Sequence, residues 1–400
     1  MSNSLGRRSR AKARPTNKIE AVPPASSLNE PAGSETRSLL GVAHTDIQKH
    51  LSPGKDRNQN LQGFDPEYVD IVNYIVRCTH RIWEEGGMGL IYTHYLHNAK
   101  IHTADGWFIG RDQVVANSIQ SLSAFPDERA YAEAVVWTGD DQAGFYTSHL
   151  VLGTAHHWGH SAYGAPTGRM TRGLGIALCY VKENLICEEW LLHDDLGTIR
   201  QLGLDLEETV ARFAQRDAAQ PLQQYGDLER TLGQQAPEPY PPKTTEFDLY
   251  DAFEMADPFD VDDFVRRNLH EIWNRRMFNV IRAVYHENYL LHRTHGWDEY
   301  GRGDYTAFVL SLLAAFPDAR FSIDQLYWNG DEANGYRTSM RWSLIGTHDG
   351  YGLFGEPTGA RLRLWGLTQH VIKDGKFVKE WTLFNEFALR KKIYLARLKT

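Results

Sequence analysis

A short segment that ends in Asp194 combines residue types suited to proton transfer. The sequence Glu-Trp-Leu-Leu-His-Asp at 189–194 returns at 380–385 as Glu-Trp-Thr-Leu-Phe-Asn, so that Asn385 stands where the first segment has Asp194. A carboxylate can accept or give a proton during a reaction, whereas an Asn side chain can only form hydrogen bonds. We therefore predict one segment that carries acid/base chemistry and a second that has lost or changed it.

The two segments belong to an internal repeat. Offsets of 190 and 191 residues relate matching residues in the same order along both copies, and one strand shifts to 193, which predicts two extra residues in the following loop of the first copy. The clearest pairs are Trp83 with Trp273, Gly106-Trp107 with Gly296-Trp297, the Ala-Phe-Pro-Asp runs at 124–127 and 315–318, the Pro-Thr-Gly turns at 166–168 and 357–359, and, at the offset of 193, Gly153-Thr154 with Gly346-Thr347. The sequence therefore predicts one domain used twice.

Periodicity within one copy predicts helices followed by strands. Apolar residues at steps of three and four predict a helix over about 66–86, and a second helix over 111–124 ends before Pro126. Extended stretches follow at 129–138, 144–156, 169–181 and 185–193, and residues 198–232 again resemble a helix. This order predicts an α+β fold with an antiparallel meander. The expected boundaries are an N-terminal tail at 1–60, domains at 61–203 and 259–400, and a helical and Pro-rich linker at 204–258.

Charge is distributed unevenly along the chain. The net charge is -8, although residues 1–18 contain six arginine and lysine residues and no acidic residue. An acidic body is a poor partner for nucleic acid. The basic tail could contact RNA or an anionic surface, or act as a transit-like signal, but its composition favours a disordered, solvating arm. The three cysteines lack metal-ligand spacing, and no apolar run is long enough to span a membrane or form a signal peptide, so we expect a cytoplasmic protein with reduced cysteines.

Three motifs of the second copy resemble a known family. Gly-Thr-His-Asp-Gly at 346–350, Gly-Glu-Pro-Thr-Gly at 355–359 and the hairpin that ends in Glu-Trp are similar to SnoaL-like polyketide cyclases of the nuclear transport factor 2-like superfold. In the first copy, the ending at 194–203 is similar too. The resemblance implies two tandem cone-shaped domains, each a curved antiparallel β-sheet wrapped around helices, with a pocket in the mouth of the cone. It also implies an acid/base carboxylate at Asp194 and no metal or organic cofactor.

Several histidines and tryptophans could complete such a site. The resemblance puts His102 and His292 near the mouth of each cone, where they could orient an enolate or only bond a backbone carbonyl. Trp107 and Trp297 beside them could form pocket walls or core, and Trp190 shares strand parity with Asp194, so both should face the same side. Asp194 could instead be a solvated strand-end residue or the cap of the next helix. Asp195 faces the other side, and we favour it as the cap.

A group of histidines crowds the third strand of the first copy and its loop. Their spacing does not suit zinc, so we expect no metal, and one of them could assist Asp194. The candidates are His149, His156, His157 and His160, matched in the second copy by His348 alone. Arg172 and Arg363 could each clamp an anionic group, but we favour cross-strand ion pairs with Glu189 and Glu380.

Together these features favour a cofactor-independent acid/base enzyme that acts on a small or medium-sized organic molecule. Asp194 would transfer the proton, His102 and His157 would assist it, and Trp107, Trp190, His149, His156 and Arg172 would contact the substrate. The corresponding pocket of the second copy would contain His292, Trp297, His348, Arg363 and Asn385. That copy would bind a ligand or pack on the first as a pseudo-dimer partner, and the chain could also form a homodimer. A non-catalytic binding or assembly module is the alternative.

Overall fold

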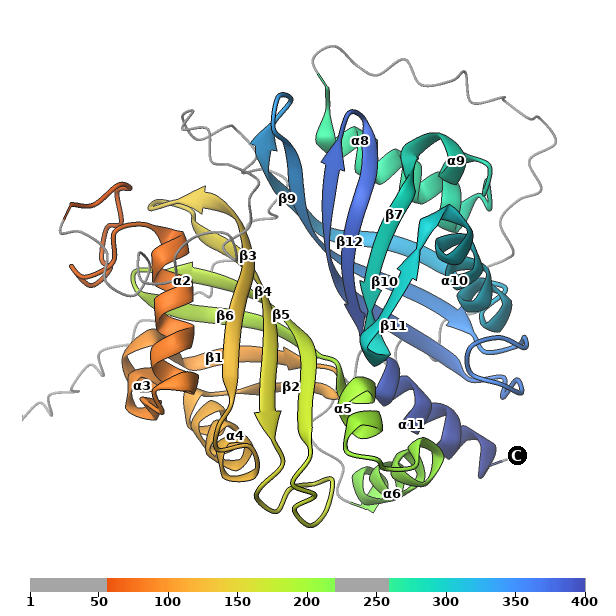
Figure 1. The fold of residues 1–400 in the computed structure, drawn as a ribbon, viewed down its shortest axis with the longest axis horizontal. Coiled ribbons are helices and arrows are strands. Elements are labelled where there is room, and N and C mark those ends of the chain that lie inside the picture. Colours follow the sequence, from red (N-terminus) through yellow and green to blue (C-terminus); the bar gives the residue numbers. More distant parts are fainter. Residues whose placement is uncertain (1–55, 220–258, 400) are drawn as a thin grey trace, which may run out of the picture.

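A computed structural model describes residues 56–219 and 259–399, which form two domains of one plan (Figure 1). The predicted tail up to residue 55 and the linker from 220 to 258 lie outside these residues. Domain 1 contains α2 (Ile71–Thr79), η3 (His80–Glu84), η4 (Met88–Leu90), α3 (Ile91–His94), β1 (Tyr95–Thr103), β2 (Gly106–Ile109), α4 (Arg111–Ala124), β3 (Arg129–Asp140), β4 (Gly144–His156), β5 (Met170–Lys182), β6 (Leu185–His193), α5 (Asp195–Gln201) and α6 (Leu206–Ala219). Domain 2 contains α8 (Val261–Leu269), η5 (His270–Asn274), α9 (Val280–Val284), β7 (Tyr285–Arg293), η6 (Thr294–Gly296), β8 (Trp297–Tyr300), α10 (Gly301–Ala315), β9 (Arg320–Asp331), β10 (Gly335–Thr347), β11 (Arg361–Lys373), β12 (Lys376–Phe384) and α11 (Glu386–Arg397).

Each domain has one six-stranded mixed sheet. The strand order is β2-β1-β6-β5-β4-β3 in domain 1 and β8-β7-β12-β11-β10-β9 in domain 2. The predicted α+β class, the four strands of the meander and the helix over 111–124 are confirmed. The sequence did not predict β1 and β2, and β1 pairs with β6 in parallel, so the sheet is mixed rather than antiparallel.

The two copies keep one offset of 191 residues through β4 and β10. Asp127 Oδ1 accepts a hydrogen bond from the backbone N–H of His156, and Asp318 Oδ1 accepts one from the backbone N–H of Thr347. His156 and Thr347 are therefore equivalent, and the predicted shift to 193 was wrong. The loops after the two strands have the same length. Repeated Gly-Thr dipeptides in neighbouring positions caused the misalignment.

Strand register separates an inner face of each sheet from an outer face. In domain 1, directly opposite residues share a face, so Thr147, Cys179 and Glu189 lie on the inner face with α2. Figure 1 shows α2 and α4 on one side of the molecule, α8 to α10 on the other, and the two sheets between them. Each inner face therefore packs against the helices of its own domain.

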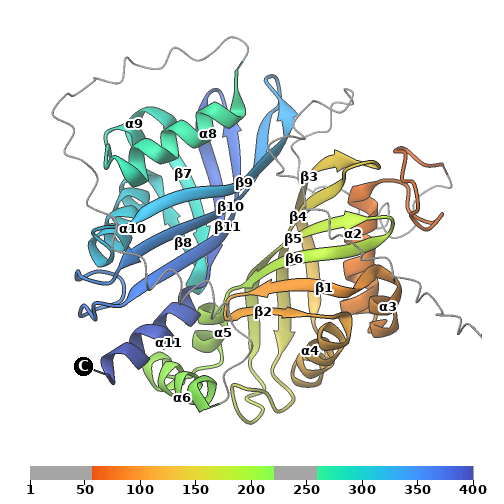
Figure 2. The same ribbon diagram turned by 180° about the vertical axis from the view of Figure 1, so that it is seen from behind.

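The outer faces of the two sheets pack on one another and form a shared core. Domain 1 contributes Ala134, Val136, Tyr146, Leu150, Ile176, Leu178, Tyr180, Trp190 and Leu192, and domain 2 contributes Tyr327, Trp365, Leu367, Trp381 and Leu383. Burial of one large apolar side chain stabilises a structure by about 1.5–3 kcal/mol, so a core of this size joins the domains firmly. The turned view in Figure 2 shows the same arrangement. The outer face of each sheet is thus covered by the other domain.

Polar contacts also join the two domains across this interface. The side chain of Asn329 in domain 2 exchanges two hydrogen bonds with the backbone of Trp137, each 2.9 Å long. Gln369 Nε2 donates to the carbonyl oxygen of Ser148 at 3.0 Å. The two copies therefore form a pseudo-dimer within one chain.

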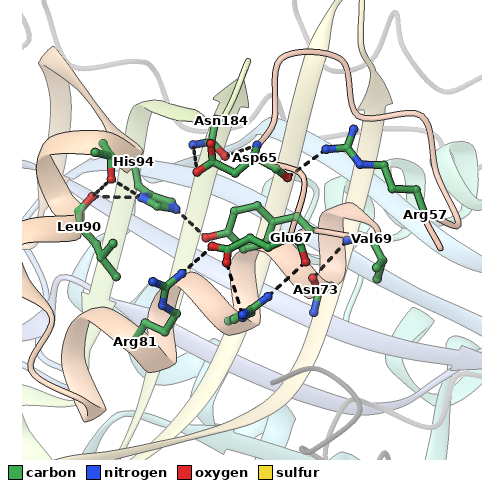
Figure 3. A network of polar contacts seen from close by, with 12 residues as sticks. Arg57, Asp65, Glu67, Val69, Asn73, Arg81, Leu90, His94 and Asn184 are labelled. Carbon is green, nitrogen blue, oxygen red and sulfur yellow. Dashed lines mark hydrogen bonds and ion pairs between the residues drawn. The ribbon is translucent and has the colours of Figure 1, made fainter. Parts of the chain in front are cut away.

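The segment before α2 is held on domain 1 by a network of polar contacts (Figure 3). The guanidinium of Arg57 donates to the carbonyl oxygen of Asp65 at 2.9 Å, and Asn184 Nδ2 donates to the Asp65 carboxylate at 3.0 Å. Arg81 Nη1 donates to Glu67 Oε1 at 2.6 Å. These contacts connect the first described residues to η3 and to the β5–β6 turn.

Candidate functional site

Asp194 lies at the end of β6, where the two domains meet. Its side chain is only 2% exposed. Oδ1 accepts one hydrogen bond from the backbone N–H of Gly197 (2.9 Å) and a second from the backbone N–H of His295 in domain 2 (2.7 Å). Burial raises the pKa of Asp194, and these backbone hydrogen bonds oppose the rise. Asp194 is therefore the N-cap of α5 and an acceptor between the domains.

The expectation that Asp195 caps this helix was wrong, because Asp195 is already its first residue. Tyr163 donates its phenol O–H to Asp195 Oδ1 at 3.5 Å. Burial and then the charges of Asp105 and Asp194 raise the pKa of Asp195 to about 7. Lys391 of domain 2 lies 2.6 Å from Asp105 Oδ1 and supplies positive charge to this group. Its Nζ also lies 2.7 Å from Asp217 Oδ2, so four carboxylates and one ammonium group meet at the interface.

The turn of domain 2 that contacts Asp194 was not found from the sequence. His295 has φ of 74°, a left-handed conformation that non-glycine residues rarely adopt. Glu386 holds this turn, because its Oε2 accepts from Thr294 Oγ1 at 2.8 Å and its Oε1 lies 3.3 Å from His295 Nε2. Although burial opposes ionisation, His295 and Arg390 lower the pKa of Glu386 to about 2. The only available signal was that His295 replaces Asp105 in the repeat.

His102 and Trp190 lie on the outer face of the sheet, against domain 2. Their rings stack with centroids 4.8 Å apart, and His102 Nε2 lies 2.7 Å from Glu188 Oε1. The guanidinium of Arg341, from domain 2, lies 4.5 Å from the centre of the Trp190 ring. Trp107 is opposite His102 in the β1–β2 register and shares this face. Trp190 therefore lies against domain 2, and contact of these three rings with a substrate stays a prediction.

Domain 2 repeats part of this arrangement. His292 stacks on Trp381 with ring centroids 5.5 Å apart, and its Nδ1 lies 2.5 Å from Asp298 Oδ1. Asn385 is buried, and its Oδ1 accepts a hydrogen bond from the backbone N–H of Trp365 at 3.0 Å. The side chain of Trp297 lies outside the described part of the chain.

His157 and His348 anchor equivalent loops. His157 Nδ1 lies 3.3 Å from Thr167 Oγ1, and His348 Nδ1 lies 3.1 Å from Thr358 Oγ1. His157 Nε2 also lies 2.8 Å from Ser161 Oγ. Because the contact to the threonine of the Pro-Thr-Gly turn recurs in both domains, it explains these histidines as loop anchors.

Two more histidines of this group, His149 and His156, point to different places, and the fourth, His160, is exposed. His149 lies on the inner face of the sheet, 2% exposed, with Nδ1 3.4 Å from Thr79 Oγ1. His156 lies at the end of β4, with Nδ1 2.6 Å from Asp127 Oδ2. The fold therefore separates His149, on the inner face of the sheet, from the loop histidines.

The two arginines do not form the expected cross-strand pairs. Arg172 is exposed, and Arg363 lies 3.4 Å from Asp324 Oδ2. In the strand register, Glu189 instead lies opposite Cys179, and Glu380 lies opposite His370. The expectation of ion pairs with Glu189 and Glu380 was wrong, because the arginines are seven residues along the strand from the positions opposite these carboxylates.

The inner faces of the two domains differ in how completely they are filled. The space between the inner face of the sheet and the helices of domain 2 is filled by four buried residues, namely Phe308, Leu312, Trp342 and Phe384. The equivalent residues of domain 1 are smaller or polar and at least partly exposed, namely Asn117, Ser121, Val151 and His193. In domain 2 the ring of Phe384 lies 6.4 Å from that of Phe308 and 6.3 Å from that of Trp342, so three aromatic side chains meet there. Domain 1 leaves the same positions open to solvent.

Two further classes of site can be checked directly. Across residues 56–219 and 259–399, no three His, Cys, Asp or Glu side chains converge as a metal site would require. Within the same residues, no helix combines the length and the apolar character needed to cross a membrane.

Comparison with known proteins agrees with this repeated architecture. The family description "SnoaL-like polyketide cyclase" matches residues 73–202 and again residues 263–393. Similar solved structures include wild-type IdmH from Streptomyces antibioticus, with 20% identity, 33% of this chain and 96% of that chain covered, and a TM-score of 0.28. TsrD from Streptomyces laurentii is 18% identical, with 33% of this chain and 93% of that chain covered and a TM-score of 0.29. A SnoaL-like polyketide cyclase from Agrobacterium tumefaciens strain C58 is 16% identical, with 33% of this chain and 96% of that chain covered and a TM-score of 0.28. No curated protein sequence matches the chain. The chain belongs to the SnoaL-like polyketide cyclase family and contains two copies of its domain.

Proposed function

We propose that this protein is a cofactor-independent acid/base enzyme that acts on a small or medium-sized organic molecule, and that the chemistry takes place in domain 1. The reaction would be a cyclisation, isomerisation, dehydration or hydrolysis, and the family description favours cyclisation. A carboxylate would take a proton from a carbon next to a carbonyl group, and the carbonyl oxygen would carry the resulting negative charge.

The observation that carries this proposal is the difference between the two inner faces. The space that Phe308, Trp342 and Phe384 fill in domain 2 is lined in domain 1 by Asn117, Val151 and His193. Binding sites for small molecules are concave and mostly apolar with a few polar groups. An apolar ligand in domain 1 would supply contacts that domain 2 makes with its own side chains.

Asp194 remains the carboxylate that the sequence proposes for proton transfer. Burial raises its pKa above the ordinary value, which is the direction expected for a carboxyl group that exchanges a proton during catalysis. Its Oδ1 is engaged by Gly197 and by His295, so the same side chain also has a structural role. Replacement of Asp194 by Asn keeps an acceptor at this place and removes the titrating group, and therefore separates the two roles.

The alternative, a binding or assembly module without catalysis, describes domain 2 well. Its inner face is filled by aromatic side chains, and Asn385 occupies the position of Asp194. We therefore propose that domain 2 supports domain 1 through the shared core and does not turn over substrate.

A ligand screen tests this proposal. Flat carbonyl compounds, including aromatic 1,3-diketones, would be ranked by thermal shift on the wild type, on Val151→Trp and on Asp194→Asn, and hits would then be assayed for turnover. We expect Val151→Trp to lose binding, because the new indole copies Trp342 and fills the inner face. Equal binding by the wild type and Val151→Trp would refute a site in domain 1, and unchanged turnover in Asp194→Asn would exclude Asp194 as the acid/base group.

A further inference from the structure

Each domain buries one glutamate on the inner face of its sheet. Glu189 on β6 and Glu380 on β12 are equivalent in the repeat and are 6% and 5% exposed. A buried carboxylate is costly unless hydrogen bonds or opposite charge compensate it. The two domains compensate it to different degrees.

Glu380 is fully compensated. Tyr289 and Thr382 donate short hydrogen bonds to its two oxygens, and His370 Nε2 lies 3.4 Å from Oε2. Although burial opposes ionisation, the hydrogen bond and charge of His370, with the two hydroxyl donors, lower the pKa of Glu380. This carboxylate is therefore held as a structural anion.

Glu189 has weaker partners. Tyr95 donates its phenol O–H to Oε2 at 3.1 Å, and the thiol of Cys179 lies 3.8 Å from Oε1. Neither group carries positive charge. The buried thiol of Cys78 also interacts with Glu189. Burial and then the negative charge of Glu189 raise the pKa of this thiol. Burial raises the pKa of Glu189 to about 7, and the two hydrogen bonds oppose the rise. This carboxyl group can therefore gain or lose a proton at neutral pH.

The surroundings of Glu189 are also less crowded. Ala99 and Cys179 stand where domain 2 has Tyr289 and His370, which are the two ring-bearing partners of Glu380. Along β6, the inner-face positions lead from Glu189 through Leu191, which is partly exposed, to His193, which is exposed. A row of side chains thus connects the buried carboxyl group to solvent on the face that domain 1 leaves open.

We propose that Glu189, on the inner face of domain 1, is the group that takes a proton from an acidic C–H bond of a flat, apolar carbonyl compound. This inference rests on the function proposed above and keeps its reaction class and its place in domain 1. It assigns the proton transfer to Glu189 instead of Asp194, because Asp194 lies where the two domains meet and not on the open inner face. The carboxylate accepts the proton, the C–H electron pair forms a carbon–carbon double bond, and the C=O π electron pair moves onto the oxygen to give an enolate. The carboxylic acid later returns the proton to the substrate. Glu380, the equivalent group of domain 2, does not transfer protons, because its three hydrogen-bond donors keep it ionised.

A generic probe of base catalysis tests the assignment without knowledge of the natural substrate. With 5-nitrobenzisoxazole, removal of the carbon-bound proton opens the N–O bond and releases a coloured nitrophenolate. We expect Glu189→Gln to lower the rate by about 100-fold or more, the usual contribution of a general base. The Gln side chain still accepts the Tyr95 hydrogen bond, so the fold should persist, which near-ultraviolet circular dichroism would check. Glu380→Gln is the matched control and should retain the wild-type rate.

The pH profile gives a second readout. The wild-type rate should rise with pH and reach half its maximum near the pKa of Glu189, about 7. Tyr95→Phe removes a donor to the charged form, so the midpoint should move to higher pH. A folded Glu189→Gln variant with the wild-type rate would overturn the inference, as would a wild type no faster than acetate in solution. Loss of the rate in Asp194→Asn but not in Glu189→Gln would also overturn it, and would leave the proposed function standing.

Discussion

The two roles of Asp194 at the interface predict different stabilities for two substitutions. Asp194→Ala removes the cap of α5, which costs about 1 kcal/mol. It also leaves the buried N–H of His295 without its acceptor, which costs about 1–3 kcal/mol. The expected loss in the free energy of unfolding is about 2–4 kcal/mol. Asp194→Asn keeps an oxygen for both N–H groups and should lose about 1 kcal/mol or less.

Urea unfolding, followed by circular dichroism and tryptophan fluorescence, measures both variants. The pH dependence adds a check, because the pKa of Asp194 is raised in the folded protein from an ordinary value of 3.8. The contribution of such a group to stability is complete below its unfolded pKa and is lost as the pH rises through the folded pKa. The free energy of unfolding of Asp194→Asn, relative to that of the wild type, should therefore be highest at neutral pH. Equal losses in the Ala and Asn variants would refute the assignment of Oδ1 as cap and inter-domain acceptor.

Two further predictions concern the same interface. The pKa of Asp195 is raised from 3.8 to about 7, so its contribution to stability is lost as the pH rises between these values. Asp195→Asn should therefore reduce the change in unfolding free energy over this pH range, which urea titration at several pH values would measure. Trp190→Ala empties part of the shared core and should cost about 3–5 kcal/mol, whereas Trp158→Ala, at a residue that is 55% exposed, should cost less than about 1 kcal/mol in the same assay, and similar losses in both would contradict the placement of Trp190 between the sheets.

The elements with a strong local pattern could be predicted from the sequence. The strands β3 to β6 alternate or run apolar between turns rich in Gly, Asp and Asn, and α4 is ended by a proline. The strand β1 carries mostly polar residues, and its partner β6 is distant in the chain. No local pattern reports a parallel pair of this kind, so β1 and β2 were missed.

The side to which a residue points could be predicted only in relative terms. Parity correctly groups Trp190 with Leu192, but it does not say which face is the interior of the cone. In a single domain the outer face would meet water and its polarity would settle the question. Here the second domain covers that face, so both faces are apolar. The site residues chosen by shared parity with Trp190 therefore belong to the domain interface.

The duplication itself shows where the two domains were free to differ. The outer faces keep matching residues. Trp190 and Trp381 both belong to the shared core, and His102 and His292 stack on them. The inner faces differ, and Trp342 shows that this backbone accepts an aromatic ring where domain 1 has only a valine. Each large apolar side chain left out of an interior forgoes about 1.5–3 kcal/mol of burial. Domain 1 lacks this stabilisation around Glu189, a carboxyl group whose pKa is near neutral. Domain 2 fills the same space and keeps Glu380 ionised. The difference is what we expect if domain 1 contains a ligand site.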